Sequence, residues 1–142
     1  VSLKKSGLVF ADTLIAKINM YYYKITGNIN GYYNSAVEYL DNYGGDRDWK
    51  LLNDVAFDMC VSGFIDSIRL KHTEKWIRKS IELNDNYYNN YTYTLLLFKI
   101  KDYDNGVKYA NKAIMIAKEE NIDYSVVEDL LGKMTSNKVN EK

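Results

Sequence analysis

The sequence predicts an all-α fold, and three features of the chain support that prediction. Apolar residues recur at three- and four-residue spacing over most of its 142 residues, as on one face of an α-helix. Proline is absent and glycine occurs 8 times, so few positions interrupt a helix. Stretches rich in Asn, Asp and Gly separate the periodic segments and are typical of turns. About seven helices follow from these boundaries.

The amino-terminal part is predicted to form three helices. The first covers about residues 7–26, where apolar residues recur at helical spacing. The second covers about residues 32–43, between a Gly- and Asn-rich break and a Gly-Gly pair. Either Asp46 or Asp48 can accept the free amides that open the third helix, which we expect to end near Ser62.

The carboxy-terminal part is predicted to form four more helices. The first of them covers about residues 67–83. The stretch 84–121, the central hairpin, then forms two helices, because apolar residues at helical spacing flank the polar turn DYDNG. Ser125 and Glu128 have the spacing of a capping box that opens the last helix.

One domain is expected over residues 1–134. A chain of 142 residues has the length of a single domain and buries roughly 70% of the surface of its unfolded form. Residues 135–142 lack apolar periodicity and are expected to form a mobile tail. Because the chain begins with Val1 and not with Met, we expect it to be part of a longer protein.

The second helix of the central hairpin carries small residues where two helix backbones would approach closely, namely Gly106, Ala110 and Ala113. This pattern resembles the tetratricopeptide repeat, a helical hairpin that stacks on its neighbours. The resemblance implies a right-handed stack of antiparallel helical hairpins. The first helix departs from the family at Asn90, where Trp is preferred, and at Thr94, where Gly is preferred.

Two weaker copies of the pattern lie upstream. A shift of 33 residues, 93 minus 60, places Cys60 on Tyr93 and brings a second unit into register. In that unit Thr73 and Ser80 take the small positions, and a third unit contains Ala36. About three repeats are needed, because one hairpin cannot bury its apolar face alone. The register aligns Phe57, Cys60 and Phe64 with Asn90, Tyr93 and Leu97.

Several short segments in the second half of the sequence also resemble a helical extension that follows thioredoxin-like domains in bacterial envelope proteins. They are Trp49, the run 76–84, and the segment 91–99. The resemblance implies a periplasmic or cell-envelope location and a redox domain upstream of Val1; otherwise a cytoplasmic location is expected. Because the chain has one cysteine, it has no Cys-x-x-Cys pair, and the resemblance assigns a redox role to none of its residues.

The charge balance disfavours two classes of partner. Lys and Arg total 19 and Asp and Glu total 19, so no net field favours nucleic acid or an anionic membrane. No apolar run has the length of a membrane span, and no membrane insertion is expected.

No set of residues specifies a reaction, so we expect no enzyme activity, no cofactor and no metal site. Cys60 lies on an apolar stripe, where a free cysteine behaves as a small buried hydrophobe. His72, the only histidine, lies in a charged run. The turn at 102–106 hints at a calcium loop, but Ala113 stands where a bidentate Glu is required. Asn90 opens an Asn-x-Thr pattern that we expect to stay unmodified.

These patterns favour a non-catalytic protein-interaction module of tetratricopeptide type, with a protein or peptide as its partner. The alternative is an accessory or substrate-positioning domain of a thioredoxin-like oxidoreductase. In that case the redox domain lies upstream, and the partner is that domain of the same chain.

The helix at about 87–100 is apolar on two faces, so it is either central in the core or presents one face to a partner. In the repeat family the corresponding face lines a groove that binds peptides. The alternative is that the first or the last helix lies across this face and seals it. By the resemblance, the binding residues are Tyr88, Tyr91, Leu95, Phe98 and Lys99, with Val55, Asp58 and Ser62 from the preceding unit.

Overall fold

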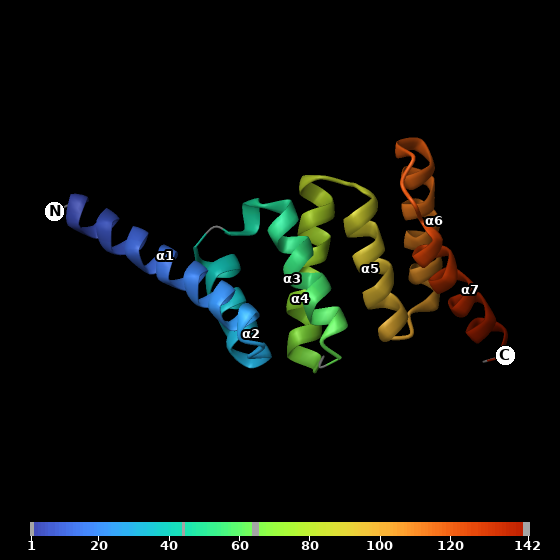
Figure 1. The fold of residues 1–142 in the computed structure, drawn as a ribbon, viewed down its shortest axis with the longest axis horizontal. Coiled ribbons are helices and arrows are strands. Elements are labelled where there is room, and N and C mark those ends of the chain that lie inside the picture. Colours follow the sequence, from blue (N-terminus) through green and yellow to red (C-terminus); the bar gives the residue numbers. More distant parts are fainter. Residues whose placement is uncertain (1, 44, 64–65, 141–142) are drawn as a thin grey trace. The chain divides into compact units, whose positions relative to one another are not determined.

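The fold is all-helical, as the sequence predicts. A computed structural model describes residues 2–43, 45–63 and 66–140. Within these ranges there are seven α-helices and no strand (Figure 1). The chain divides into two compact units, Val1–Asp48 and Trp49–Lys142. The single domain over 1–134 stays a prediction. The division arises because the helices of the first unit pack mainly on each other.

The first unit consists of α1 (Ser2–Ile25), α2 (Ile29–Val37), the π-helix η1 (Glu38–Asn42) and the 3-10 helix η2 (Gly45–Arg47). The Asn28 side chain caps α2 by accepting a hydrogen bond from the Gly31 amide at 2.9 Å. Gly31 also lies close to α1, because a Cβ added there would come within 2.6 Å of the Tyr23 ring. Ala16 and Met20, one turn apart, are the buried apolar residues among the described side chains of α1.

The boundaries of α2 differ from those predicted. The sequence places this helix at 32–43, whereas it begins at Ile29. The reason is that Asn28, inside the predicted break, is itself the cap. The helical path then continues past Val37 as a π-helix that ends at Asn42.

The second unit contains α3 (Trp49–Val61), α4 (Ser67–Leu83), α5 (Tyr87–Lys99), α6 (Tyr103–Glu120) and α7 (Ser125–Asn140). Helices α3 and α4 form one antiparallel hairpin, and α5 and α6 form a second (Figure 1). Near the end of α4, the Ser80 hydroxyl donates to the carbonyl oxygen of Trp49, at the start of α3, at 2.7 Å. Helix α7 packs on α6 and α5.

Helix α5 contributes to two buried clusters and so connects the parts of the second unit. On one side Tyr93, Leu96 and Leu97 join Ala56, Cys60 and Ile77 of α3 and α4. On the other side Tyr87 joins a cluster of residues from α6 and α7. Helix α5 of the central hairpin therefore belongs to both buried clusters of the second unit.

The small residues of α6 lie where helices approach closely, as predicted. Gly106, Ala110 and Ala113 are all buried. A Cβ added to Gly106 would clash with the Met134 sulfur of α7 and lie 3.6 Å from Leu97 of α5. The close approach thus involves the last helix as well as the partner helix of the hairpin.

The repeat register of 33 residues does not superpose the starts of the helices. Helices α3 and α5 begin 38 residues apart, 87 minus 49, and α4 and α6 begin 36 apart, 103 minus 67. One cause is the connection from α3 to α4, residues 62–66, which is longer than the connection 100–102. Phe64, used in the predicted register, lies outside the described residues.

Helix α7 differs from its prediction at both ends. Its backbone is helical through Asn140, so residues 135–140 continue the helix that was predicted to end at Met134. The mobility of residues 135–142 stays a prediction. At its start, Asp123 accepts a hydrogen bond from the Ser125 amide at 2.9 Å. This backbone bond lowers the pKa of Asp123, and the Ser125 hydroxyl adds to the effect. In the predicted capping box the Ser125 hydroxyl accepts from the Glu128 amide, whereas in the structure this amide donates to the carbonyl oxygen of Tyr124 at 3.0 Å.

Candidate functional site

The stripe of α5 that was predicted to bind a partner is partly covered. Tyr88 is 54% exposed, whereas Tyr91, Leu95 and Phe98 are half-buried. The half-buried residues pack against the cluster that α5 shares with α6 and α7. The last helix thus covers part of the stripe, which is one of the two alternatives left open by the sequence, and the rest remains accessible to solvent.

Tyr88, the exposed residue of this stripe, is the end of a row of aromatic rings whose other members are buried or half-buried. Tyr91 lies between Phe57 of α3, 6.1 Å away between ring centroids, and Tyr87, 6.3 Å away with the rings stacked. Tyr88 meets Tyr87 edge-on at 5.3 Å. Burial raises the pKa of Tyr87 and of Tyr91, so both hydroxyls stay protonated at neutral pH. Such rings combine apolar area with a polar tip, a combination enriched at protein interfaces.

The residues predicted from the preceding unit do not extend this row. Val55 is fully buried on the same face of α3 as Met59, so it offers no surface to a partner. The Ser62 hydroxyl donates to the carbonyl oxygen of Met59 at 2.8 Å. Asp58 is half-buried, and Lys99 is exposed at the end of α5. The residues brought together on one helix are Tyr88, Tyr91, Leu95 and Phe98.

A shallow depression of about 470 Å³ opens beside Phe98 and is lined on its other side by α7. Lys133 and Asp129 form an ion pair there, with 2.6 Å between nitrogen and oxygen. The Asn137 side chain donates to the Tyr103 hydroxyl at 3.3 Å, and the Tyr103 ring lies 6.2 Å from that of Phe98. The depression therefore has an aromatic side and a polar side. Gly132 and Ser136 complete its lining.

The α7 side of this depression was not predicted, because its residues are polar and form no apolar stripe, and because residues 135–142 were assigned to a tail. A signal was nevertheless present. The lining residues of α7 recur at intervals of one, three and four positions, which places them on one helical face: Asp129, Gly132, Lys133, Ser136 and Asn137.

A second cavity, of about 310 Å³, is lined by residues of α3, α4 and α5. Burial raises the pKa of the Cys60 thiol to about 12, and the nearby charge of Lys99 offsets only part of that rise. The neutral thiol is a poor nucleophile at neutral pH. Asp66, on the same cavity, caps α4 by accepting from the amides of Ile68 at 2.9 Å and Arg69 at 2.8 Å. Both groups have structural roles, and the predicted burial of Cys60 is confirmed.

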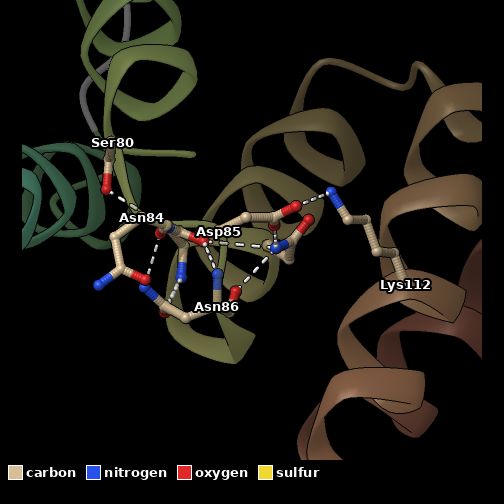
Figure 2. A network of polar contacts seen from close by, with 7 residues as sticks. Ser80, Asn84, Asp85, Asn86 and Lys112 are labelled. Atoms are coloured by element: carbon tan, nitrogen blue, oxygen red, sulfur yellow. Dashed lines mark hydrogen bonds and ion pairs between the residues drawn. The ribbon is translucent and has the colours of Figure 1, made fainter. Parts of the chain in front are cut away.

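A network of amide side chains joins the end of α4 to the start of α5 (Figure 2). Asn86 caps α5 by accepting from the amides of Tyr88 at 2.9 Å and Asn89 at 3.3 Å. The Asn89 side chain accepts in return from the Asn86 amide at 3.1 Å, which completes a capping box. Asn89 also donates to the Ser80 hydroxyl at 3.2 Å and to the Asn84 carbonyl oxygen at 2.6 Å. The turn between the two hairpins is thereby fixed.

Asn90 and Asp85 connect this network to α6. The fully buried Asn90 donates to a carboxylate oxygen of Asp85 at 2.6 Å and to the Asn86 carbonyl oxygen at 2.7 Å. Lys112 of α6 pairs with the other carboxylate oxygen of Asp85 (Figure 2). Burial acts to raise the pKa of Asp85, but the hydrogen bonds from Lys112 and Asn90 together hold it below its ordinary value. Asn90 is thus a buried polar anchor and offers no exposed amide for glycosylation.

Among the remaining chemically suggestive residues, His72 has an aromatic neighbour. The His72 ring stacks on Trp76, with 5.7 Å between centroids and 17° between planes. Over the described ranges, no three His, Cys, Asp or Glu side chains gather in a way that could hold a metal ion. Within the same ranges, no helix combines the length and the apolar character needed to cross a bilayer.

No protein-family model, curated protein or solved structure matches this chain.

Proposed function

We propose that the second unit is a non-catalytic protein-interaction module, and that the exposed edge of α5 with the adjoining face of α7 binds an apolar segment of a protein partner. The observation that carries this proposal is the exposed Tyr88 ring at the edge of α5 together with the depression beside Phe98, which has one aromatic and one polar side. Aromatic side chains with polar groups around them are typical of the energetic centres of protein interfaces.

The arrangement of the helices supports the same proposal. Helix α5 belongs to one hairpin and packs on the preceding one, as the first helix of an internal tetratricopeptide-type repeat does. In that family such a helix lines the peptide groove. The resemblance therefore favours a stack of the tetratricopeptide type in which the α5 edge binds a partner.

The contacts of α5 narrow the set of residues proposed to touch a partner. Tyr91, Leu95 and Phe98 all pack on the core of the second unit, so substitution of each would also report on stability. Phe98 differs from the other two because it also lines the depression. Tyr88 is accessible, and Phe98 lines the depression together with Lys133. We therefore assign partner contact chiefly to Tyr88, Phe98 and Lys133.

Selection of peptides from a random displayed library on the full chain tests this proposal. A synthetic copy of a selected peptide is titrated against the wild type and two variants, Tyr88→Ala and Phe98→Ala. The expected result is saturable binding that each variant weakens by about tenfold or more, the effect of removing an aromatic anchor. Met115→Ala is the matched control, because Met115 on α6 is 54% exposed, the same fraction as Tyr88.

Circular dichroism melting of each variant separates loss of binding from loss of folding. The proposal is wrong if no peptide binds saturably, or if Met115→Ala weakens binding as much as Tyr88→Ala does. It is also wrong if both α5 variants keep the affinity of the wild type.

A further inference from the structure

Helix α1 of the first unit exposes a continuous apolar stripe. Seven large apolar residues of this helix are between 45% and 84% exposed. They recur at intervals of three and four positions, so they lie along one face over about four turns of helix. We call them the α1 stripe: Phe10, Leu14, Ile15, Ile18, Tyr21, Tyr22 and Ile25.

The α1 stripe lies opposite the face with which α1 packs inside the first unit. Ala16 and Met20 are buried, and the half-buried Tyr23 lies against Gly31 of α2. At 100° per residue, these positions are on the side of the helix away from Ile18, the centre of the stripe. The helix is therefore apolar on two faces, and only one of them is covered.

The exposed area has the size that a stable dimer requires. A fully exposed large apolar side chain presents about 200 Å². The exposed fractions of the α1 stripe therefore amount to roughly 800 Å², above the roughly 300–600 Å² of the largest patch on a typical monomer. A standard protein interface buries about 800 Å² on each partner. Pairing with a second α1 stripe would thus bury an interface of ordinary size.

The charges of α1 also favour pairing with an identical stripe. Asp12, Lys17 and Lys24 lie beside the stripe and not within it. The Lys17 ammonium lies 5.8 Å from the centre of the Tyr39 ring, and that of Lys24 lies 5.7 Å from the centre of the Tyr32 ring. Both cations are drawn towards the covered side of the helix, so pairing of two stripes would bury no unpaired charge. An anionic membrane surface fits less well, because its headgroups would have to draw both cations away from the Tyr39 and Tyr32 rings.

We propose that the chain forms a homodimer in which the α1 stripes of two copies pack against each other. The apolar side chains of one copy cover those of the other, and the two faces of α1 then have separate roles. One holds α2 in place within the first unit. The other holds the second copy.

Sedimentation equilibrium of the full chain over a wide concentration range tests this proposal. The expected result is a reversible change from the monomer mass of 16.5 kDa to twice that mass. Ile18→Lys places a charge from each copy at the centre of the interface and should raise the dissociation constant by about tenfold or more. Ile18 is 55% exposed and the control residue Met115 of α6 is 54% exposed, so Met115→Lys should leave the dissociation constant unchanged.

Thiol cross-linking gives a second test that does not depend on the affinity. Ile18→Cys adds an accessible thiol to the chain. The native Cys60 is buried and therefore should not compete in the reaction. Mild oxidation should link two copies through this residue, whereas Met115→Cys should not be linked. The proposal is overturned by a monomer at every concentration, by a dimer that Ile18→Lys does not weaken, or by a monomer that binds vesicles of anionic lipid through the stripe.

Discussion

Helices α1 and α5 are both apolar on more than one face, yet their environments differ. Helix α5 packs on α3, α4, α6 and α7, and most of its residues are buried. Helix α1 packs on α2 and η1 within the first unit and exposes the α1 stripe. Apolar periodicity therefore predicts that a segment is helical, but the burial of each face depends on how many neighbours the fold supplies.

Burial of polar side chains gives a second contrast between the two helices. Helix α5 buries Asn89, Asn90, Thr92 and Thr94. The threonine hydroxyls donate to carbonyl oxygens one turn earlier, Thr92 to Tyr88 at 3.1 Å and Thr94 to Asn90 at 2.8 Å. Burial of these groups is tolerated because they are hydrogen-bonded. The helix with more neighbours thus hides polar side chains, while the one with fewer neighbours exposes apolar ones.

The largest expected difference between the two helices is in the free energy of unfolding that is lost when one apolar residue in each helix is truncated. Leu97→Ala removes a side chain that is 2% exposed at the centre of the second unit, and should lower the free energy of unfolding by about 2–5 kcal/mol. Ile18→Ala, at a residue that is mostly exposed, should lower it by less than about 1 kcal/mol in the monomer. Urea denaturation at low protein concentration measures both values. Equal losses would show that the two helices are buried to the same degree.

Thiol labelling should give the next largest contrast. The Cys60 thiol is buried, its pKa is raised to about 12, and it reacts only when the structure opens. A thiol at Ile18→Cys is accessible and needs no opening. If opening costs about 4 kcal/mol, Cys60 should react roughly a thousandfold more slowly. Comparable rates in the absence of denaturant would place Cys60 in a mobile part of the second unit.

Local signals in the sequence predict much of the second unit. The bounds of α4 agree with the predicted range 67–83, and the helix is capped by Asp66, directly before that range. The buried small residues of α6 also follow from their spacing. Each of these features depends on neighbours close in sequence, through capping or helical periodicity.

Features that depend on distant neighbours could not be predicted in this way. The burial of Val55 and the exposure of Ile18 depend on which other helices pack there, although both residues fit an apolar stripe. In the sequence, Asn90 departs from the residue type that the repeat pattern prefers. In the structure it is part of the core, because its side chain donates hydrogen bonds to Asp85 and to the Asn86 carbonyl oxygen. The α7 side of the candidate site was missed because polar residues of that helix line a depression and do not form an apolar stripe.

Removal of one side chain from the amide network should have an intermediate effect on the free energy of unfolding. Asn89→Ala removes the acceptor for the Asn86 amide and the donor to Ser80 and Asn84. Since these groups lose a partner in a buried setting, the free energy of unfolding should fall by about 1–3 kcal/mol. Asn111→Ala, at an exposed position of α6, should stay within about 0.5 kcal/mol of the wild type. Urea denaturation checks both, and equal effects would remove the structural role of the network.

The smallest effect is the pH dependence contributed by Asp85. Its folded-state pKa is lowered, because hydrogen bonds from Lys112 and Asn90 outweigh burial. The stabilisation is therefore complete above the ordinary Asp value of about 4 and is lost as the pH falls through the lower folded-state pKa. The Asp85 side chain is 44% exposed, so screening by water limits the contribution to less than about 1 kcal/mol.

A double-mutant cycle of Asp85→Asn and Lys112→Met isolates this contribution. At about pH 7 the interaction energy of the pair should be favourable, and at about pH 2 it should be smaller, because protonation of the carboxylate increases as the pH falls towards its folded-state pKa. The matched cycle on the exposed pair of Asp129 and Lys133 in α7 measures an ion pair within a single helix. Since the pair of Asp85 and Lys112 joins the start of α5 to α6, its loss should also speed hydrogen exchange in the first turn of α5, which the α7 pair should not affect. An interaction energy that is unchanged between the two pH values would show that Lys112 does not stabilise the Asp85 carboxylate.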